Sequence, residues 1–109
     1  MTAPPDRETL SAADDVTEWR NADSSVAGYV TFQISGTWVG TITFQGYVRD
    51  SALPVAVVAE QMSTDGTKAT TTTANGIFRV DASALGGVRC KMSAYTSGDA
   101  DVDKNEVIG

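Results

Sequence analysis

The chain has 109 residues, of which 41% are hydrophobic, enough for one globular domain and too many for a wholly disordered protein. Eight Lys and Arg residues against fourteen Asp and Glu give a formal charge of −6, which disfavours nucleic acid as a partner. The single cysteine, Cys90, excludes an intrachain disulfide, and the absence of histidine removes the commonest general base and transition-metal ligand.

The pattern of hydrophobicity carries no targeting signal. No apolar run approaches the roughly 18 residues of a membrane-spanning helix. The first residues also lack the apolar core of a secretory signal peptide. We therefore expect a protein that is made in a cytoplasm and has no membrane partner.

Residues 1–15 form a polar segment that contains Pro4 and Pro5 and shows no strand alternation. Chain termini of this composition are usually mobile, which favours a flexible N-terminal arm followed by a β-sandwich domain over residues 16–109. A sharper alternative is an arm that orders only against a partner, with Leu10 as its single apolar anchor. Pro4, Pro5 and Leu10 are therefore candidate partner-binding residues.

Residues 29–48 contain two runs in which apolar and polar side chains alternate around a short break at 35–37. Successive side chains of a strand point to opposite faces, so each run has one apolar face. Because the three-residue break contains glycine, the two runs are predicted to form a β-hairpin.

Glycine-containing turns divide the second half of the chain into short segments. Asp-Gly at 65–66 and Asn-Gly at 75–76 are preferred hairpin turns, and residues 77–81 and 88–95 alternate like strands. Cys90 lies on the apolar face of the last run, which predicts a small core residue rather than a nucleophile.

Seven or eight short strands with turns about every ten residues predict an all-β fold. We expect an antiparallel β-sandwich with jelly-roll or Greek-key connections. The shared alternation predicts one core, formed by Val30, Phe32, Ile34, Trp38, Ile42, Phe44, Phe78, Val80, Val88, Cys90 and Met92.

Alternate carboxylates near the C-terminus resemble the start of a calcium-binding loop. Asp99, Asp101 and Asp103 occupy positions one, three and five of such a loop. Lys104 stands where the loop needs glycine, and the bidentate twelfth position would lie beyond Gly109. The favoured interpretation is three acids on one solvated strand face, with no metal bound.

The residues show no catalytic constellation. There is no histidine to activate a serine, and the glycines occupy turns without a phosphate-loop pattern. Fourteen acids make accidental carboxylate pairs inevitable, and Glu60 with Asp81 is one such pair. We expect a protein that is not an enzyme and needs no cofactor.

Tyr29, Tyr47 and Tyr95 fall on predicted outer faces of their strands. They are candidate partner-binding residues, either as an aromatic platform for sugars or at a subunit contact. Packing between the sheets or at a subunit contact is the commoner fate of tyrosines scattered over different strands.

Three sequence blocks resemble a small β-sandwich domain of tailed-bacteriophage virion proteins. Residues 36–46 (GTWVGTITFQG) are similar to the family's GTWxGTITFxG block. Residues 75–81 (NGIFRVD) and 88–100 (VRCKMSAYTSGDA) are similar to its second and third blocks, in the same order and spacing. The family often has a Gly-Gly turn and a Trp after the first block, which residues 47–54 lack, and an apolar last strand, which is acidic here.

The resemblance implies a structural protein of the virion, without catalytic residues. We favour a head decoration (cement) protein that binds the major capsid protein lattice on the outer capsid surface and stabilises the shell. Self-association as a trimer or another small oligomer fits the same role. The alternatives are a collar, tail or baseplate component and, from a different class, a carbohydrate-binding adsorption module.

Overall fold

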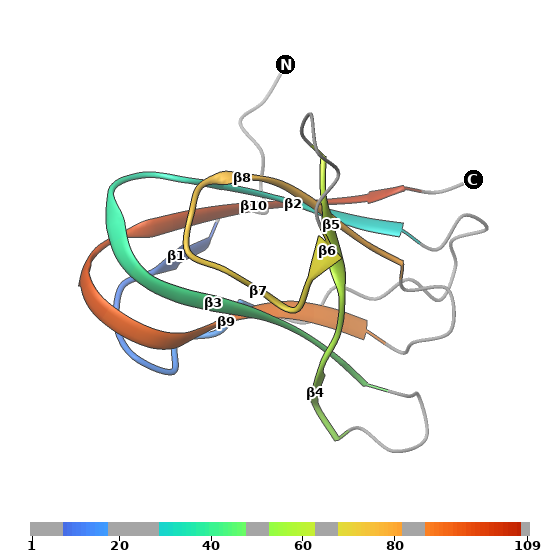
Figure 1. Ribbon diagram of the computed structural model, residues 1–109, viewed down its shortest axis with the longest axis horizontal. Coiled ribbons are helices and arrows are strands. Elements are labelled where there is room, and N and C mark those ends of the chain that lie inside the picture. The colour runs from blue at the N-terminus through green and yellow to red at the C-terminus, as the bar shows by residue number, and fades with distance from the viewer. Residues whose placement is uncertain (1–7, 18–28, 48–52, 63–67, 82–86, 108–109) are drawn as a thin grey trace.

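A computed structural model of the chain describes residues 8–17, 29–47, 53–62, 68–81 and 87–107. These residues form two antiparallel sheets packed face to face, which confirms the predicted all-β sandwich (Figure 1). Ten strands are present in the described residues rather than seven or eight, because residues 55–61 and 68–72 each form two short strands and Glu8–Leu10 adds a strand in the expected arm. Among the same residues, no helix is long and apolar enough to cross a membrane.

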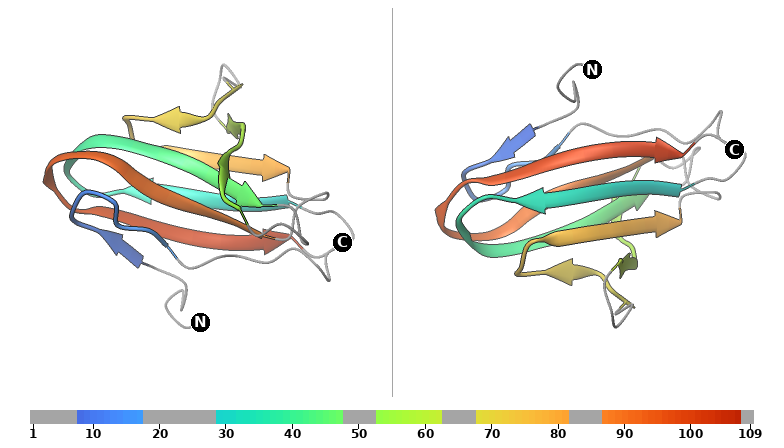
Figure 2. Two further views of the ribbon diagram at one scale, coloured as in Figure 1. Left: turned by 90° about the horizontal axis from the view of Figure 1, so that it is seen from below. Right: turned by 90° about the horizontal axis from the view of Figure 1, so that it is seen from above.

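Sheet A has six strands in the order β1-β10-β2-β8-β5-β6. They are β1 (Glu8–Leu10), β10 (Ala100–Val107), β2 (Tyr29–Ser35), β8 (Gly76–Asp81), β5 (Ala59–Gln61) and β6 (Lys68–Ala69). Every neighbouring pair is antiparallel, and the long strands β10, β2 and β8 lie side by side in its middle (Figure 2).

Sheet B is built around β3 (Trp38–Tyr47). The long strand β9 (Gly87–Gly98) pairs with one edge of β3 along its whole length. The short strands β4 (Val55–Ala56) and β7 (Thr71–Thr72) pair with β3 one after the other and so occupy its second edge.

The core lies between the two sheets. The predicted core residues are buried, except that Trp38 is half-buried and packs against the core from its rim. Four further apolar side chains complete the core: Leu10, Ala59, Ala100 and Val102. Ala100 and Val102 come from β10, so this acidic strand contributes an apolar face that the predicted core does not include.

The predicted hairpin at residues 29–48 is wrong. β2 pairs with β8 and β10 in sheet A, whereas β3 pairs with β9, β4 and β7 in sheet B. Residues 36–37 therefore carry the chain from one sheet to the other. Asn-Gly at 75–76 likewise joins β7 of sheet B to β8 of sheet A. Two strands that each have one apolar face can pair side by side in one sheet or lie face to face in two sheets. Both arrangements need the same alternation, so the sequence pattern does not distinguish them.

The N-terminal segment is also corrected where the structure describes it. β1 pairs with β10, and Leu10 is 1% exposed in the core rather than available to a partner. Further on, Val16 pairs with Lys91 on the outer edge of β9. Residues 8–17 thus form a strap across the edges of both sheets, because the backbone groups of β10 and β9 would otherwise lack partners there. Residues 1–7, with Pro4 and Pro5, lie outside the described part of the chain.

The strap ends on a buried polar residue. Thr17 is 1% exposed, and its Oγ1 accepts a hydrogen bond of 3.1 Å from the backbone N–H of Cys90. The Thr17 N–H donates in turn to the Cys90 carbonyl at 3.0 Å. The buried thiol of Cys90 therefore sits in a packed, hydrogen-bonded stretch, in agreement with a core role.

On the opposite side, the chain between β4 and β5 also changes sheets. Phe44 of β3 donates its N–H to the Thr70 carbonyl at 2.9 Å and accepts from the Val57 N–H at 2.8 Å. β4 and β5 belong to different sheets, as do β6 and β7. Both open sides of the sandwich are therefore closed by segments that cross between the layers.

Candidate functional site

Three of the strand connections that change sheets meet at one end of the sandwich (Figure 1). β2 passes to β3 through residues 36–37, β7 passes to β8 through 73–75, and β9 passes to β10 through Asp99. We name residues 36–38, 73–75 and 98–99 the corner cluster. Because loops at the ends of sandwiches are the segments least constrained by the core, this end is the first place to search for function.

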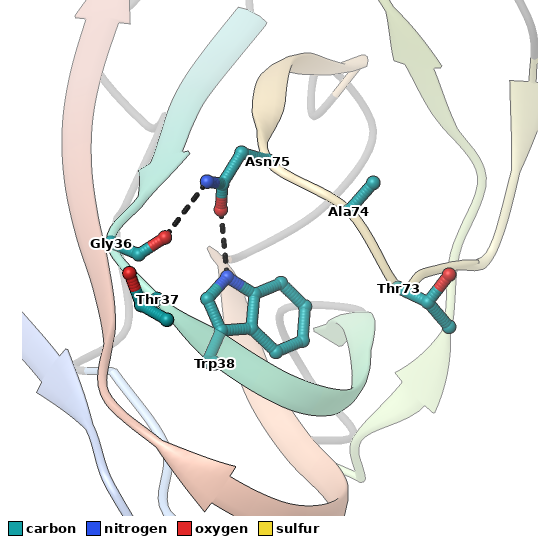
Figure 3. Close-up of a pocket in the computed structure, with 6 residues that line it drawn as sticks. All are labelled: Gly36, Thr37, Trp38, Thr73, Ala74 and Asn75. Atoms are coloured by element: carbon teal, nitrogen blue, oxygen red, sulfur yellow. Dashed lines mark hydrogen bonds between the residues drawn. The ribbon is translucent and has the colours of Figure 1, made fainter.

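Asn75 holds two of these connections together. Its Oδ1 accepts a hydrogen bond of 2.7 Å from the indole Nε1–H of Trp38, and its Nδ2 donates to the Gly36 carbonyl at 2.9 Å (Figure 3). The Asn75 amide thus hydrogen-bonds to the β2–β3 corner through both its oxygen and its nitrogen. The expected hairpins placed Trp38 at the start of a strand and Asn75 in a separate turn, so the sequence pattern did not bring them together.

Backbone contacts join the third connection to the first. The Asp99 N–H donates to the Thr37 carbonyl at 3.0 Å. Gly36 and Gly98 have φ of +98° and +87°, and a Cβ on Gly98 would lie 2.2 Å from the Thr37 oxygen. Only glycine permits both the left-handed backbone and this approach.

A pocket of about 300 Å³ opens beside these contacts. Its lining side chains carry no charge, and its lining residues are Gly36, Thr37, Trp38, Thr73, Ala74 and Asn75. The six-membered ring of the indole points toward Ala74 and Thr73, away from the hydrogen bond at Nε1 (Figure 3). The pocket therefore combines an aromatic surface with neutral polar groups.

The alternation predicted Tyr95 on the outer face of its strand, but it does not lie there. It packs against the core, and its hydroxyl donates to the Gly98 carbonyl at 3.0 Å. The cause is a bulge: Thr41 is paired with Ala94 and Ile42 with Met92, which leaves Ser93 as an extra residue on β9. An inserted residue reverses the alternation beyond it, so Ala94 is exposed and Tyr95 turns inward.

Tyr47 does not join Tyr95 in one surface. Tyr47 is half-buried at the far end of β3, where its ring lies over Gly87. Tyr29 begins β2, and its side chain lies outside the described residues. Among the described side chains, Tyr47 and Tyr95 therefore do not form an aromatic platform.

The acidic residues near the C-terminus line the outside of β10. Asp99 is exposed, and Asp101 accepts a hydrogen bond of 2.8 Å from the Thr9 hydroxyl. Within the described residues, no three His, Cys, Asp or Glu side chains gather as metal ligands would. Glu60 forms an ion pair of 2.8 Å with Arg79 and therefore faces a cation. The expected absence of a metal and of catalysis stays a prediction.

Exposed large apolar side chains concentrate on the side of the sandwich formed by residues 53–62. Four lie in that segment, and Ile77 lies beside it because the Met62 N–H donates to the Ile77 carbonyl at 2.7 Å. We name these residues the β4–β5 patch: Leu53, Val55, Val58, Met62 and Ile77, which are 69%, 57%, 54%, 49% and 41% exposed. A gathering of this kind on a small domain is typical of a contact surface.

No protein family model and no curated protein sequence matches the chain. Its fold is similar to that of the SPBc2 prophage-derived protein YomS, with a TM-score of 0.71 and 20% identity over 95% of this chain and 94% of YomS. It is equally similar to the PBSX exported protein XepA, with a TM-score of 0.71 and 18% identity over 90% of this chain.

At these identities the likeness shows the fold. The chain spans nearly all of YomS but only 37% of XepA, so the same sandwich occurs both as almost a whole protein and as part of a longer one. The three sequence blocks resemble a phage β-sandwich domain, and the SPBc2 prophage-derived protein YomS shares this fold.

Proposed function

We propose that the chain is a structural protein of a phage virion, and specifically a head decoration protein on the outer surface of the capsid. The observation that carries the proposal is the fold shared with the SPBc2 prophage-derived protein YomS. The phage-type sequence blocks at 36–46, 75–81 and 88–100 support it independently of the fold.

The β4–β5 patch is the surface we assign to the capsid. Burying apolar area contributes roughly 25 cal/mol per Å², so a few valine and leucine side chains supply several kcal/mol to a contact. Leu10 is in the core and therefore does not anchor an arm on neighbouring subunits. Docking through a preformed sandwich face also avoids the entropic cost of ordering a disordered segment.

Stabilisation of the shell follows if the patch contacts the assembled lattice and not the free subunit. A ligand shifts an equilibrium only by its difference in affinity for the two states. We therefore expect binding to assembled capsids and much weaker binding to unassembled capsid protein. Self-association of the chain as a trimer or another small oligomer would multiply these contacts on one lattice.

The proposal is tested by cosedimentation of the purified chain with capsids assembled without it. Val55→Asp and Val58→Asp, which place charges in the patch, should each weaken binding by about tenfold, the equivalent of about 1.4 kcal/mol. Val39→Asp is the matched control, because Val39 is as exposed as Val55 but lies outside the patch. Binding to tails, collars or baseplates instead of capsids would replace decoration by one of those roles.

A further inference from the structure

We propose that the pocket beside Trp38 binds a neutral saccharide. The site is separate from the proposed capsid contact, since no residue of the β4–β5 patch lines it. It does not use the tyrosines that the sequence indicated as an aromatic platform. The inference rests on the chemistry of the pocket wall, its lack of charge, its size and its rigidity.

The indole of Trp38 supplies the apolar wall. Its single N–H is already donated to Asn75, so the indole contributes ring surface to the pocket and no free donor. The face of an aromatic ring carries negative potential, which attracts positively polarised C–H groups. One face of a pyranose ring presents a row of such C–H groups and therefore fits a surface of this kind.

The pocket lining also carries polar groups that could contact the hydroxyls of a sugar. The exposed side chains of Thr37 and Thr73 each bring a hydroxyl, which both donates and accepts. The Asn75 amide keeps a second N–H beyond the one given to Gly36, and the Gly36 carbonyl keeps a second lone pair. These groups suit a ligand that carries several hydroxyls.

The absence of charged lining residues selects against ionic ligands. A bound phosphate, carboxylate or ammonium group would find no counter-charge among the residues of the pocket. The net charge of −6 adds a general repulsion toward acidic saccharides. A neutral hexose unit meets neither obstacle.

The pocket is small, and its walls are fixed before any ligand arrives. A volume of about 300 Å³ lies at the lower end of ligand sites, which suits one or two sugar rings. Asn75 ties one wall to the other through both ends of its amide. A preformed site loses little entropy on binding, but so small a contact limits the affinity, and we expect a Kd of about 1 mM.

Weak single sites become effective when many copies share one particle. Repeated display of the chain on a virion would raise the binding to a glycan-coated surface by avidity, without new contacts. The affinity of one chain for a short saccharide is therefore the quantity to measure first, because it does not depend on where the chain sits in the virion.

The test is a titration of the ¹⁵N-labelled protein with cellobiose, maltose and di-N-acetylchitobiose, followed on the indole Nε1–H signal of Trp38. That signal is assigned by its loss in Trp38→Phe, since the chain has two tryptophans. We expect at least one disaccharide to shift it saturably, together with the backbone amides of 73–75. Ala74→Arg should abolish the shift by filling the pocket, whereas Ala56→Arg, at another exposed alanine, in β4, should preserve it.

Two results would overturn the proposal. One is an unmoved Trp38 signal with all three disaccharides at ten times the expected Kd. The other is a shift that Ala74→Arg leaves intact while the variant keeps a folded spectrum. A proline-rich peptide that shifts the signal when no saccharide does would assign the pocket to a protein partner instead. Capsid binding is measured separately, so failure here leaves the decoration proposal standing.

Discussion

The indole Nε1–H of Trp38 donates a 2.7 Å hydrogen bond to Oδ1 of Asn75, 37 residues further along the chain. The bond connects the β2–β3 corner to the β7–β8 corner, and both corners carry the chain between the two sheets. A single polar contact thus links two of the corners at which the chain changes sheets. The same contact forms part of the pocket wall.

We predict that Asn75→Ala lowers the free energy of unfolding by about 1–2 kcal/mol, because two hydrogen bonds are lost at an exposed site. Asn75→Asp keeps the acceptor for Trp38 but loses the donor to Gly36, so its effect should be intermediate. Urea denaturation measures both, and Gln33→Ala on the exposed face of β2 is the control. Equal stability of all three variants would mean that the amide contributes nothing.

Leu10 and Leu53 form a matched pair for the role of the N-terminal segment. Leu10 is 1% exposed and Leu53 is 69% exposed. Leu10→Ala should therefore cost about 2–5 kcal/mol, whereas Leu53→Ala should change stability by less than about 0.5 kcal/mol. If thermal unfolding found the two variants equally stable, β1 would be a dispensable tail and its place in the core would be wrong.

Gly98 tests the close approach of the corners. In Gly98→Ala the new Cβ would meet the Thr37 carbonyl in a backbone with φ of +87°, so we expect a loss of at least about 3 kcal/mol. Gly76→Ala is the comparison, since its φ is not left-handed and its Cβ would approach side chains rather than backbone, Gln61 Nε2 at 3.1 Å and the Phe78 ring at 3.3 Å. Circular dichroism during heating should show a large fall in Tm for the first variant and a small one for the second.

Phe44 occupies the centre of the core, with ring centroids 6.2 Å from Phe32 and 5.3 Å from Phe78. Its two neighbours come from sheet A, so Phe44 joins the layers. Phe44→Ala should cost about 3–5 kcal/mol, a large fraction of the stability of a domain of this size. A variant that unfolds within about 1 kcal/mol of the wild type in urea would contradict this packing.

Alternation in the sequence predicts the buried faces of β2, β3 and β8, and of β9 as far as Met92. Phe32, Phe44 and Met92 all lie in the core that the period of two indicates. It was insufficient for the pairing of strands, because a hairpin and a crossing between sheets need the same alternation. The glycine at 36 therefore signalled a change of direction correctly but did not reveal which strands become neighbours.

The other predictions that the structure corrects were wrong for local reasons. Glu8–Leu10 is too short a strand to show any period, and one leucine among polar residues resembles a tail. The bulge at Ser93 interrupts the alternation of β9 without any glycine or proline to mark it. Trp38 follows one turn signal and Asn75 belongs to another, but their contact depends on the sheet crossing and so could not be predicted from either turn alone.

The measurement that tests the proposed function most directly is a cryo-electron microscopy reconstruction of the virion that contains this chain. The account predicts density for the sandwich at repeated positions on the outer capsid surface, with residues 53–62 and Ile77 facing the shell. Density for the chain confined to the collar, tail or baseplate, or its absence from the particle, would contradict head decoration.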